Sequence, residues 1–565
     1  MATAGANRPL KDKLRDRWGA LKAERASWRP HWQELSNNLL PRSGRFFTQD
    51  RNRGERRYNA IYDSTGTRAL SILSAGLMAG ATSPARRWFK LRTSDKDLNK
   101  YRPVKMWLND VTTLMETVFQ RSNTYRALPT MYKELGCFGT AATIVRPSFD
   151  TIIRHHTLTC GEYCLATNFN GEVDTMYREF EMTVAQMVEE FKYENCSQSV
   201  RNAYDKGDLD LWHPVIHAIE PRTARDHGNP SAKHMAWGSW YFELGTDSAG
   251  WLRESGFEYF PVLAPRWDVA GGDIYGHSPG MEALGDIKQL QHEQLRKAQA
   301  IDYQTRPPLQ VPTSMKNREV DTLPGGVTYY DPTSPTGGIR SLFEVRLELG
   351  HLLADIQDVR RRITGAFYAD LFLLLTSAAD TRMTATEVAE RHEEKLLMLG
   401  PVLGRMHTEL LSPLIETTFA RMQAARIVPE GPPELKEVEL DIEFVSTLAQ
   451  AQRAVGAGSI DRWLGNVGEV AAFAPQVLDN VNVDYWCENY ADILGVDPEM
   501  IVPVEKVDAI RQDRAAQEQA AAQAEQMEQQ SKALANVAQA NGPDNQLTNV
   551  MDQVTGYNTP GIVPS

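Results

Sequence analysis

The sequence lacks the motifs that mark most phosphate-handling enzymes. The Walker A pattern G-x4-G-K-[S/T] is absent from all 565 residues, and no glycine cluster has the G-x-G-x-x-G spacing of a dinucleotide site. The zinc-protease motif H-E-x-x-H is absent as well. A chain without a phosphate-cradling lysine loop is not a P-loop ATPase, so we expect no enzymatic activity and no cofactor.

Long apolar runs are also missing. No window approaches the ~20 apolar residues that a membrane-spanning helix needs, and residues 1–20 lack the apolar centre of a secretory signal. We therefore expect a chain that is made and kept in the cytoplasm and has no membrane partner. The length of 565 residues predicts about four structural units, at roughly 150 residues per domain.

Cysteine is scarce. The five cysteines are an odd and scattered set, which favours reduced thiols over a disulfide framework. One segment, HHTLTCGEYC, holds four residues of the zinc-binding types, but its Cys-x3-Cys spacing differs from that of zinc fingers and favours ordinary strand and loop residues. We assign no metal to these four residues, which are His155, His156, Cys160 and Cys164.

Charge is spread unevenly along the chain, which carries a net charge of −12. Residues 1–60 hold 14 lysines and arginines against 6 acidic residues, whereas residues 431–565 hold 7 against 21. This asymmetry suggests that the N-terminal end meets an acidic partner, although a solvated face at each end is the simpler explanation. An acidic protein is not a tight, non-specific duplex binder, since such binding depends on neutralised phosphates.

Periodicity predicts a mixed chain rich in helix. Residues 10–40 form an amphipathic helix, broken near Pro30, and residues 62–145 are mainly helical. Short β-branched and aromatic runs between turn residues predict an antiparallel β-rich region over 140–270, with one embedded helix near EMTVAQMVEEFKYE. The expected fold class is therefore α+β, predominantly helical.

The middle of the chain predicts a projecting hairpin. A helix runs over 279–305 until Pro307 and Pro308 end it, a proline-rich β excursion covers 306–345, and a second helix covers 346–370. Ser278 is placed to cap the first helix and Pro279 suits its first turn. Gly285 lies inside that helix at a cost of ~1 kcal/mol, which predicts a close backbone approach by a neighbour.

The last third alternates again. Residues 371–385 start apolar and become a small-residue loop, and the T-x-x-E spacing of Thr384 and Glu387 predicts the start of a helix in which Pro401 makes a kink. A strand follows near 436–446, then helices over 447–505 and a polar helix over 506–540. Residues 541–565 are predicted to be a flexible tail.

One segment resembles a known family. Residues 266–312 begin RWDVAGGDIYGHSPGMEALGD, and this segment is similar to the signature of the head-to-tail connector, or portal, proteins of short-tailed, podovirus-type bacteriophages. In that signature a tryptophan leads into Y-G-x-x-P-x-x-x-x-L-x-D and a long helix. The order of elements agrees over roughly residues 10–500, but the match is specific only over 266–312.

The resemblance implies a ring of about twelve copies around a channel for duplex DNA at one vertex of the virion. It implies that homologous regions form a wing, two stem helices, a β clip, a tunnel loop, a kinked helix with a strand returning to the wing, a crown, a helical barrel and a flexible tail. Those regions correspond to residues 1–278 for the wing, 279–305 and 346–370 for the stem, 306–345 for the clip, 371–385 for the tunnel loop, 386–446 for the returning segment, 447–505 for the crown, 506–540 for the barrel and 541–565 for the tail.

The resemblance also implies partners and contact residues. The partners would be other copies of the chain, DNA, the terminase large subunit, tail adaptor proteins, and the major capsid and scaffold proteins. Ser278, Pro279 and Gly285 would serve stem packing. The clip residues implied to bind partners are Lys316, Arg318, Tyr329 and Tyr330. The residues implied to face the channel are Lys288, Arg296, Lys297, Arg360, Arg361, Arg362, Thr376, Ser377, Asp380 and Arg382.

Two alternatives stay open from the residues alone. Arg360, Arg361 and Arg362 are as compatible with salt bridges between subunits as with DNA contact. At the level of function, the chain is either a portal ring, another virion structural or scaffold protein, or an enzyme subunit of the packaging machinery. The missing Walker A lysine disfavours the enzyme, and the helix, β excursion and helix disfavour an elongated scaffold.

Overall fold

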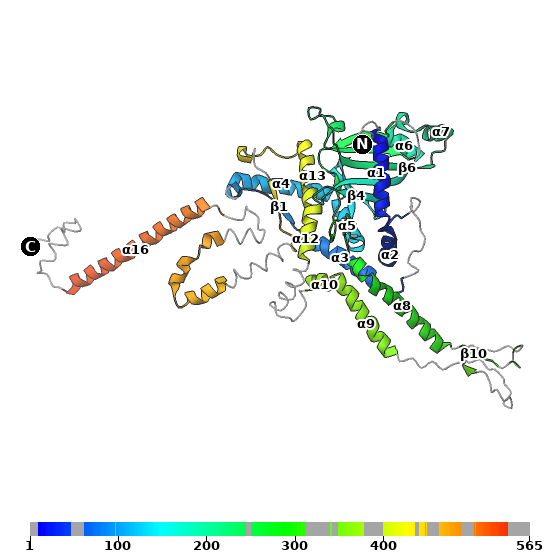
Figure 1. The fold of residues 1–565 in the computed structure, drawn as a ribbon. Coiled ribbons are helices and arrows are strands. Elements are labelled where there is room, and N and C mark those ends of the chain that lie inside the picture. Colours follow the sequence, from blue (N-terminus) through cyan, green and yellow to red (C-terminus); the bar gives the residue numbers. More distant parts are fainter. Residues whose placement is uncertain are drawn as a thin grey trace, which may run out of the picture. The chain divides into compact units, whose positions relative to one another are not determined.

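The computed structural model describes residues 9–46, 61–95, 98–244, 250–306, 308–311, 313, 316, 340–341, 349–377, 399–435, 440–446, 448, 463–486, 502 and 504–540. The chain divides into two units, residues 1–482 and residues 483–565, each described here by itself. Helices hold most of the ordered backbone and antiparallel sheets the rest, so the expected α+β, predominantly helical class is confirmed (Figure 1).

Of the two N-terminal helices, the first covers one face of the five-stranded sheet and the second packs in the largest core. α1 (Leu10–Arg25) and α2 (Arg29–Leu39) are separated by a three-residue turn, and Pro30 lies in the first turn of α2 rather than inside a helix. This confirms the predicted break. Leu14, Trp18 and Leu21 of α1 are buried against the sheet, which is why the apolar stripe faces inward.

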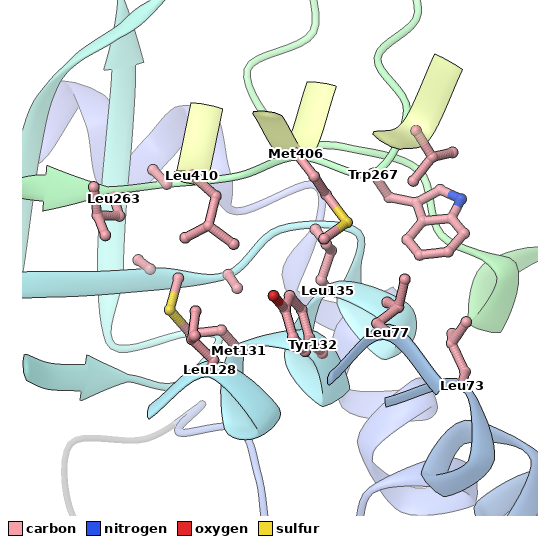
Figure 2. Packing of buried hydrophobic residues seen from close by; sticks show 14 of the residues in the cluster. Leu73, Leu77, Leu128, Met131, Tyr132, Leu135, Leu263, Trp267, Met406 and Leu410 are labelled. Atoms are coloured by element: carbon pink, nitrogen blue, oxygen red, sulfur yellow. The ribbon is translucent and has the colours of Figure 1, made fainter. Parts of the chain in front are cut away.

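The largest core forms where three helices meet the smaller sheet. These are α3 (Thr65–Ala81), α4 (Arg102–Arg121) and α5 (Thr124–Phe138). Figure 2 shows side chains of α3 and α5 interlocking with residues from later in the chain. Gly136 permits this approach, because a Cβ atom there would lie 2.8 Å from Leu73. The residues labelled in that view are Leu73, Leu77, Leu128, Met131, Tyr132, Leu135, Leu263, Trp267, Met406 and Leu410.

The predicted β-rich region forms two antiparallel sheets. A five-stranded meander runs β4-β5-β6-β7-β8, and a three-stranded sheet runs β3-β2-β9. α6 (Val184–Phe191) is the predicted embedded helix, capped by Thr183 and Gln186, and α7 (Gln198–Lys206) follows it unpredicted. The strands are β2 (Ala142–Ser148), β3 (Ile152–Leu158), β4 (Tyr163–Thr167), β5 (Val173–Thr183), β6 (Trp212–Pro221), β7 (Trp237–Glu243), β8 (Arg253–Phe257) and β9 (Val262–Leu263).

The predicted returning strand finds a partner that sequence reasoning missed. β12 (Leu440–Phe444) pairs antiparallel with β1 (Phe89–Thr93), a five-residue strand inside the region predicted to be mainly helical. Phe89 and Leu91 of β1 are buried and alternate with half-buried residues, but so short an alternation is a weak signal between long helices.

Two long helices form the predicted hairpin. α8 (Pro279–Thr305) has the predicted bounds, and α9 (Leu349–Ala366) lies beside it (Figure 1). Near their far ends β10 (Leu309–Gln310) pairs with β11 (Arg340–Ser341), the described part of the expected β excursion. Every buried residue of α8 lies within 279–291, and the described residues beyond Gln291 are half-buried or exposed.

The predicted loop over 371–385 is wrong in its first half. Residues 371–377 belong to α10 (Ala369–Ser377), a helix whose Leu371 and Phe372 are buried. The reason is packing: the Phe372 ring lies over Gly76 of α3, where a Cβ atom would be 2.1 Å from it. The apolar start of the segment therefore belongs to the core, and residues 378–385 lie outside the described residues.

The kink predicted at Pro401 is misplaced. Pro401 lies in the first turn of α12 (Gly400–Met406), where a proline costs nothing. The irregular turn is a π-helix over His407–Leu411, followed by α13 (Ser412–Ala424) with Pro413 in its first turn. Pro413 has no N–H to donate to the turn before it, which favours the widened turn there.

The remaining described elements are short or separate. Short 3₁₀ helices occur at Leu98–Lys100, Tyr193–Asn195, Ala232–His234, Pro433–Leu435 and Pro475–Asn480, and residues 463–471 are helical. In the second unit α16 (Val504–Ala540) confirms the predicted polar helix, and Arg511 is paired with Asp484. Among the described helices, none combines the length and the apolarity that crossing a membrane requires.

A buried glutamate ties α5 to the loops around it. Glu134 is 2% exposed, and its carboxylate accepts bonds from the Cys160 N–H at 3.0 Å and the Thr159 hydroxyl at 2.8 Å. Burial is the main cause that raises the pKa of Glu134 from 4.5 to about 7, against those bonds. The folded state therefore binds a proton that the unfolded state releases near pH 4.5.

We expect the body to lose stability as the pH rises from 4.5 to about 7, by on the order of 3 kcal/mol, because the buried carboxylate must ionise. Glu134→Gln should flatten this dependence in urea unfolding curves followed by tryptophan fluorescence. The exposed Glu258→Gln is the control and should keep the wild-type profile. An unchanged profile in Glu134→Gln would contradict this role for the carboxyl.

Candidate functional site: the root of the helical hairpin

The segment before α8 crosses the end of α5, backbone against backbone. Gly139 ends α5 at φ 76°, its carbonyl accepts the Trp267 N–H at 2.9 Å, and the Gly276 N–H donates to the Thr140 hydroxyl at 2.8 Å. A Cβ atom at Gly139 would lie 2.1 Å from the Gly276 carbonyl, and one at Gly276 would lie 2.3 Å from the Gly139 carbonyl. Both glycines are therefore required for the crossing.

The first turn of α8 is anchored to the same place. The Ser278 hydroxyl accepts the Met281 N–H at 3.0 Å and donates to the Cys137 carbonyl at 2.8 Å. Pro279 lies in the first helical turn, so the predicted roles of Ser278 and Pro279 in starting the helix are confirmed. Gly280 packs on the end of α5, since a Cβ atom there would lie 2.9 Å from the Cys137 carbonyl.

Gly285, which was predicted to allow a close backbone approach, has no such approach from within its own described chain. Gly285 has open space around the position of a Cβ atom, with no atom of the described chain within 4 Å. The close approaches of the segment are made at Gly276 and Gly280, at the root of the helix rather than within it. A role for Gly285 in packing against another chain stays a prediction.

Residues 276–280 also match the nucleophile-elbow pattern G-x-S-x-G, which sequence analysis overlooked. Ser278 does not have the environment of a nucleophile. It is 1% exposed, both of its hydrogen bonds go to backbone groups, and no strand leads into it. Its role is to cap α8 and join it to α5.

A buried ion pair holds the signature segment to the π turn. Arg266 is 4% exposed and Nη2 lies 2.7 Å from Oε1 of Glu409, while its N–H donates to Oε2 of the same carboxylate at 2.8 Å. Nη2 also donates to the Gly171 carbonyl at 2.8 Å. Sequence reasoning missed this pair. The signal was the arginine directly before the tryptophan of the signature, but its partner is 143 positions away.

A second polar cluster ties both hairpin helices to the loop before α3. The Gln291 side chain accepts the N–H groups of Tyr62 and Asp63 and donates to the Asp63 carbonyl. The Asp63 carboxylate accepts Arg360 Nη2 at 2.6 Å and Gln294 Nε2 at 3.1 Å. Burial acts to raise the pKa of Asp63, but bonds from Thr65 and Arg360 outweigh it and lower the pKa.

Three of the seven basic residues proposed for the channel are bridged to carboxylates elsewhere in the chain. Arg360 binds Asp63, Arg362 lies 3.2 Å from Asp286 of α8, and Lys288 binds Glu34 of α2. These bridges form inside one chain, so the alternative of salt bridges between subunits stays a prediction. The less committed residues are Arg361, whose side chain is 76% exposed with Asp358 at 3.8 Å, and Arg296 and Lys297 on the far half of α8.

The other predicted site residues are scattered over the chain or lie outside the described residues. Lys316 is exposed in a turn, and Thr376 and Ser377 end α10. Cys160 and Cys164 are buried in different cores, and His155 bonds the Thr124 hydroxyl at 3.0 Å, so HHTLTCGEYC does not gather its four side chains. The residues outside the described ranges are Arg318, Tyr329, Tyr330, Asp380 and Arg382.

Comparison with known proteins gives one consistent result. The family model described as bacteriophage head to tail connecting protein matches residues 11–502. The chain is 57% identical to the probable portal protein of Bordetella phage BPP-1, over 96% of this chain and 98% of that one. It is 46% identical to the portal protein of Salmonella phage epsilon15, over 90% of this chain and 92% of that one.

A solved virion of a native gene transfer agent particle contains a similar chain. The match covers 77% of this chain and 95% of that chain at 11% identity, with a TM-score of 0.34. A TM-score of this size supports no structural argument, so the assignment depends on the sequence relatives.

Gly276 and Gly285, nine positions apart, should respond oppositely to alanine. Gly276→Ala should lower the free energy of unfolding by more than about 3 kcal/mol, because the new methyl group meets a carbonyl oxygen that cannot move. In the unassembled chain, Gly285→Ala should raise it by about 1 kcal/mol, because the helix interior there is open. Urea unfolding measures both, and equal effects would contradict the crossing.

Proposed function

The chain belongs to the bacteriophage head to tail connecting protein family, and on that basis we propose that it forms a ring whose paired stem helices surround a channel for duplex DNA. It is a structural connector rather than an enzyme, and its place is the virion, at the portal vertex. About twelve copies would close the ring through one repeated heterologous contact.

The ring is supported most by the exposed apolar side chains on the far half of the hairpin. Among the described residues α8 has no buried residue after Gln291, and Ile301 of α8 and Leu353 of α9 are each 40% exposed. Apolar side chains on isolated helices need neighbours, and a second copy of the same hairpin supplies them. In that arrangement Gly285, with its open face, would lie at the contact between copies.

The charge pattern of the stem suits a channel through which DNA slides. Residues 281–306 hold four basic and four acidic residues, and Lys288, Arg360 and Arg362 are already paired. Each phosphate that a channel neutralised would add salt-dependent affinity and hence drag. We propose that Arg296, Lys297 and Arg361 supply weak contacts to passing DNA, together with the segment after α10.

The remaining partners are assigned by position along the hairpin and body. The β excursion at the far end of the stem would bind the terminase large subunit during filling and tail adaptor proteins afterwards. The wing, with its sheets and covering helices, would contact the major capsid and scaffold proteins. Residues 447–505 and α16 would form the crown and barrel.

The mass of the purified full-length protein tests the proposal. Native mass spectrometry should give about twelve times the 63.5 kDa of one chain, and negative-stain images should show rings with a central hole. A compact monomer at the concentrations used for imaging would contradict the ring. Rings without a central hole would contradict the channel alone.

A further inference from the structure

Three arginines gather around one uncharged side chain, Tyr241, in the wing. Arg178 of β5, Tyr241 of β7 and Arg253 of β8 fall on one row across the five-stranded sheet, with His217 of β6 between them. Arg146 reaches the same place from β2, where Nη2 donates to the Tyr241 hydroxyl at 3.3 Å. Arg253 lies over the Tyr241 ring, with its Cζ atom 4.6 Å from the ring centroid. A neutral phenol oxygen has two lone pairs and offsets no charge.

The cluster is short of negative charge. Arg253 is bridged to Glu190 at 2.7 Å, whereas neither Arg146 nor Arg178 forms a salt bridge with any carboxylate in the described part of the chain. Glu162 attracts Arg178 from a distance but is itself bridged to Arg45. The guanidinium groups of Arg45, Arg146, Arg178 and Arg253 therefore share two carboxylates, those of Glu162 and Glu190.

Burial makes this imbalance costly. Arg178 is 2% exposed, and its buried Nε has no hydrogen-bond partner among the described residues. A desolvated cation without a counter-charge is among the most unfavourable groups a fold can hold. The two histidines do not help, because burial first and then the neighbouring arginines lower the pKa of His156 to about 3 and that of His217 well below its ordinary value.

We propose that Arg146, Arg178 and Arg253 bind a phosphate group beside the Tyr241 hydroxyl. Guanidinium forks match the oxygens of a phosphate in geometry and charge, and three forks around one tyrosine side chain exceed what a single carboxylate would need. Access is limited, because Arg178 is buried while Arg146 is half-buried and the Arg253 side chain is 39% exposed. The site therefore takes a small or terminal phosphate, either free phosphate or the end of a DNA strand, and not the middle of a duplex.

This site is independent of the channel. It lies on the sheet of the wing, and it requires neither the stem hairpin nor a ring. A bound phosphate would neutralise the buried arginines of the wing, and we expect a wing with phosphate bound to be more stable than one without.

Calorimetric titration of inorganic phosphate into the full-length protein, in chloride buffer of constant ionic strength, tests the proposal. We expect one phosphate per chain with a Kd of about 1 mM or lower. Arg178→Met should weaken binding at least about tenfold, because it removes a charge-assisted pair of hydrogen bonds. Arg222→Met is the matched control. Arg222 also lies over an aromatic ring of this sheet but is paired with Glu254, so its loss should leave phosphate affinity unchanged.

Arg146→Met provides the second test if Arg178→Met does not fold, since Arg146 is only half-buried. Absence of saturable binding to the wild type, wild-type affinity in the arginine variants, or equally tight binding of glutamate would each overturn the proposal. A blunt DNA duplex with 5′-phosphates that competes, where the 5′-hydroxyl duplex does not, identifies a DNA end as the source. Binding of phosphate without competition from either duplex identifies free phosphate.

Discussion

The hairpin depends on one backbone crossing, in which Gly139 and Gly276 pass each other with no room for a side chain. That crossing places Ser278 where it can cap α8 and bond the Cys137 carbonyl at the end of α5. It also brings Arg266 within reach of Glu409, so that the body, the stem and the π turn meet at one place. The direction in which α8 leaves the body is therefore decided by contacts at its first turn.

Several basic residues that the sequence suggested would bind partners instead form salt bridges or hydrogen bonds within the chain. In the basic N-terminal region Lys22 is bridged to Glu179, and Arg25 donates to the carbonyls of Gly161 and Tyr163. Arg360 of the hairpin forms a bridge with Asp63, 297 positions away. Charge along the sequence therefore overstates what remains available to partners, and the described surface of the hairpin offers only a few uncommitted cations.

The sequence predicted well the features that are set by residues close together in the chain. The bounds of α8 follow from Ser278, Pro279 and the prolines after Arg306, and the broken N-terminal helix follows from Pro30. It predicted poorly whatever depends on distant partners. The strand β1 is recognisable only beside β12, the burial of Leu371 and Phe372 only against α3, and Arg266 only with Glu409. Gly285 is a further example, because a glycine inside a helix predicts close packing by a neighbour but does not show whether that neighbour belongs to the same chain or to another copy.

The central proposal is that α8 is buried by its own chain only over residues 279–291 and by neighbouring copies beyond them. Amide hydrogen exchange in assembled rings and in the unassembled chain measures this directly. The account predicts that residues 279–291 exchange slowly in both states, while residues 292–305 become slow only in the ring. Equal protection of residues 292–305 in both states would contradict it.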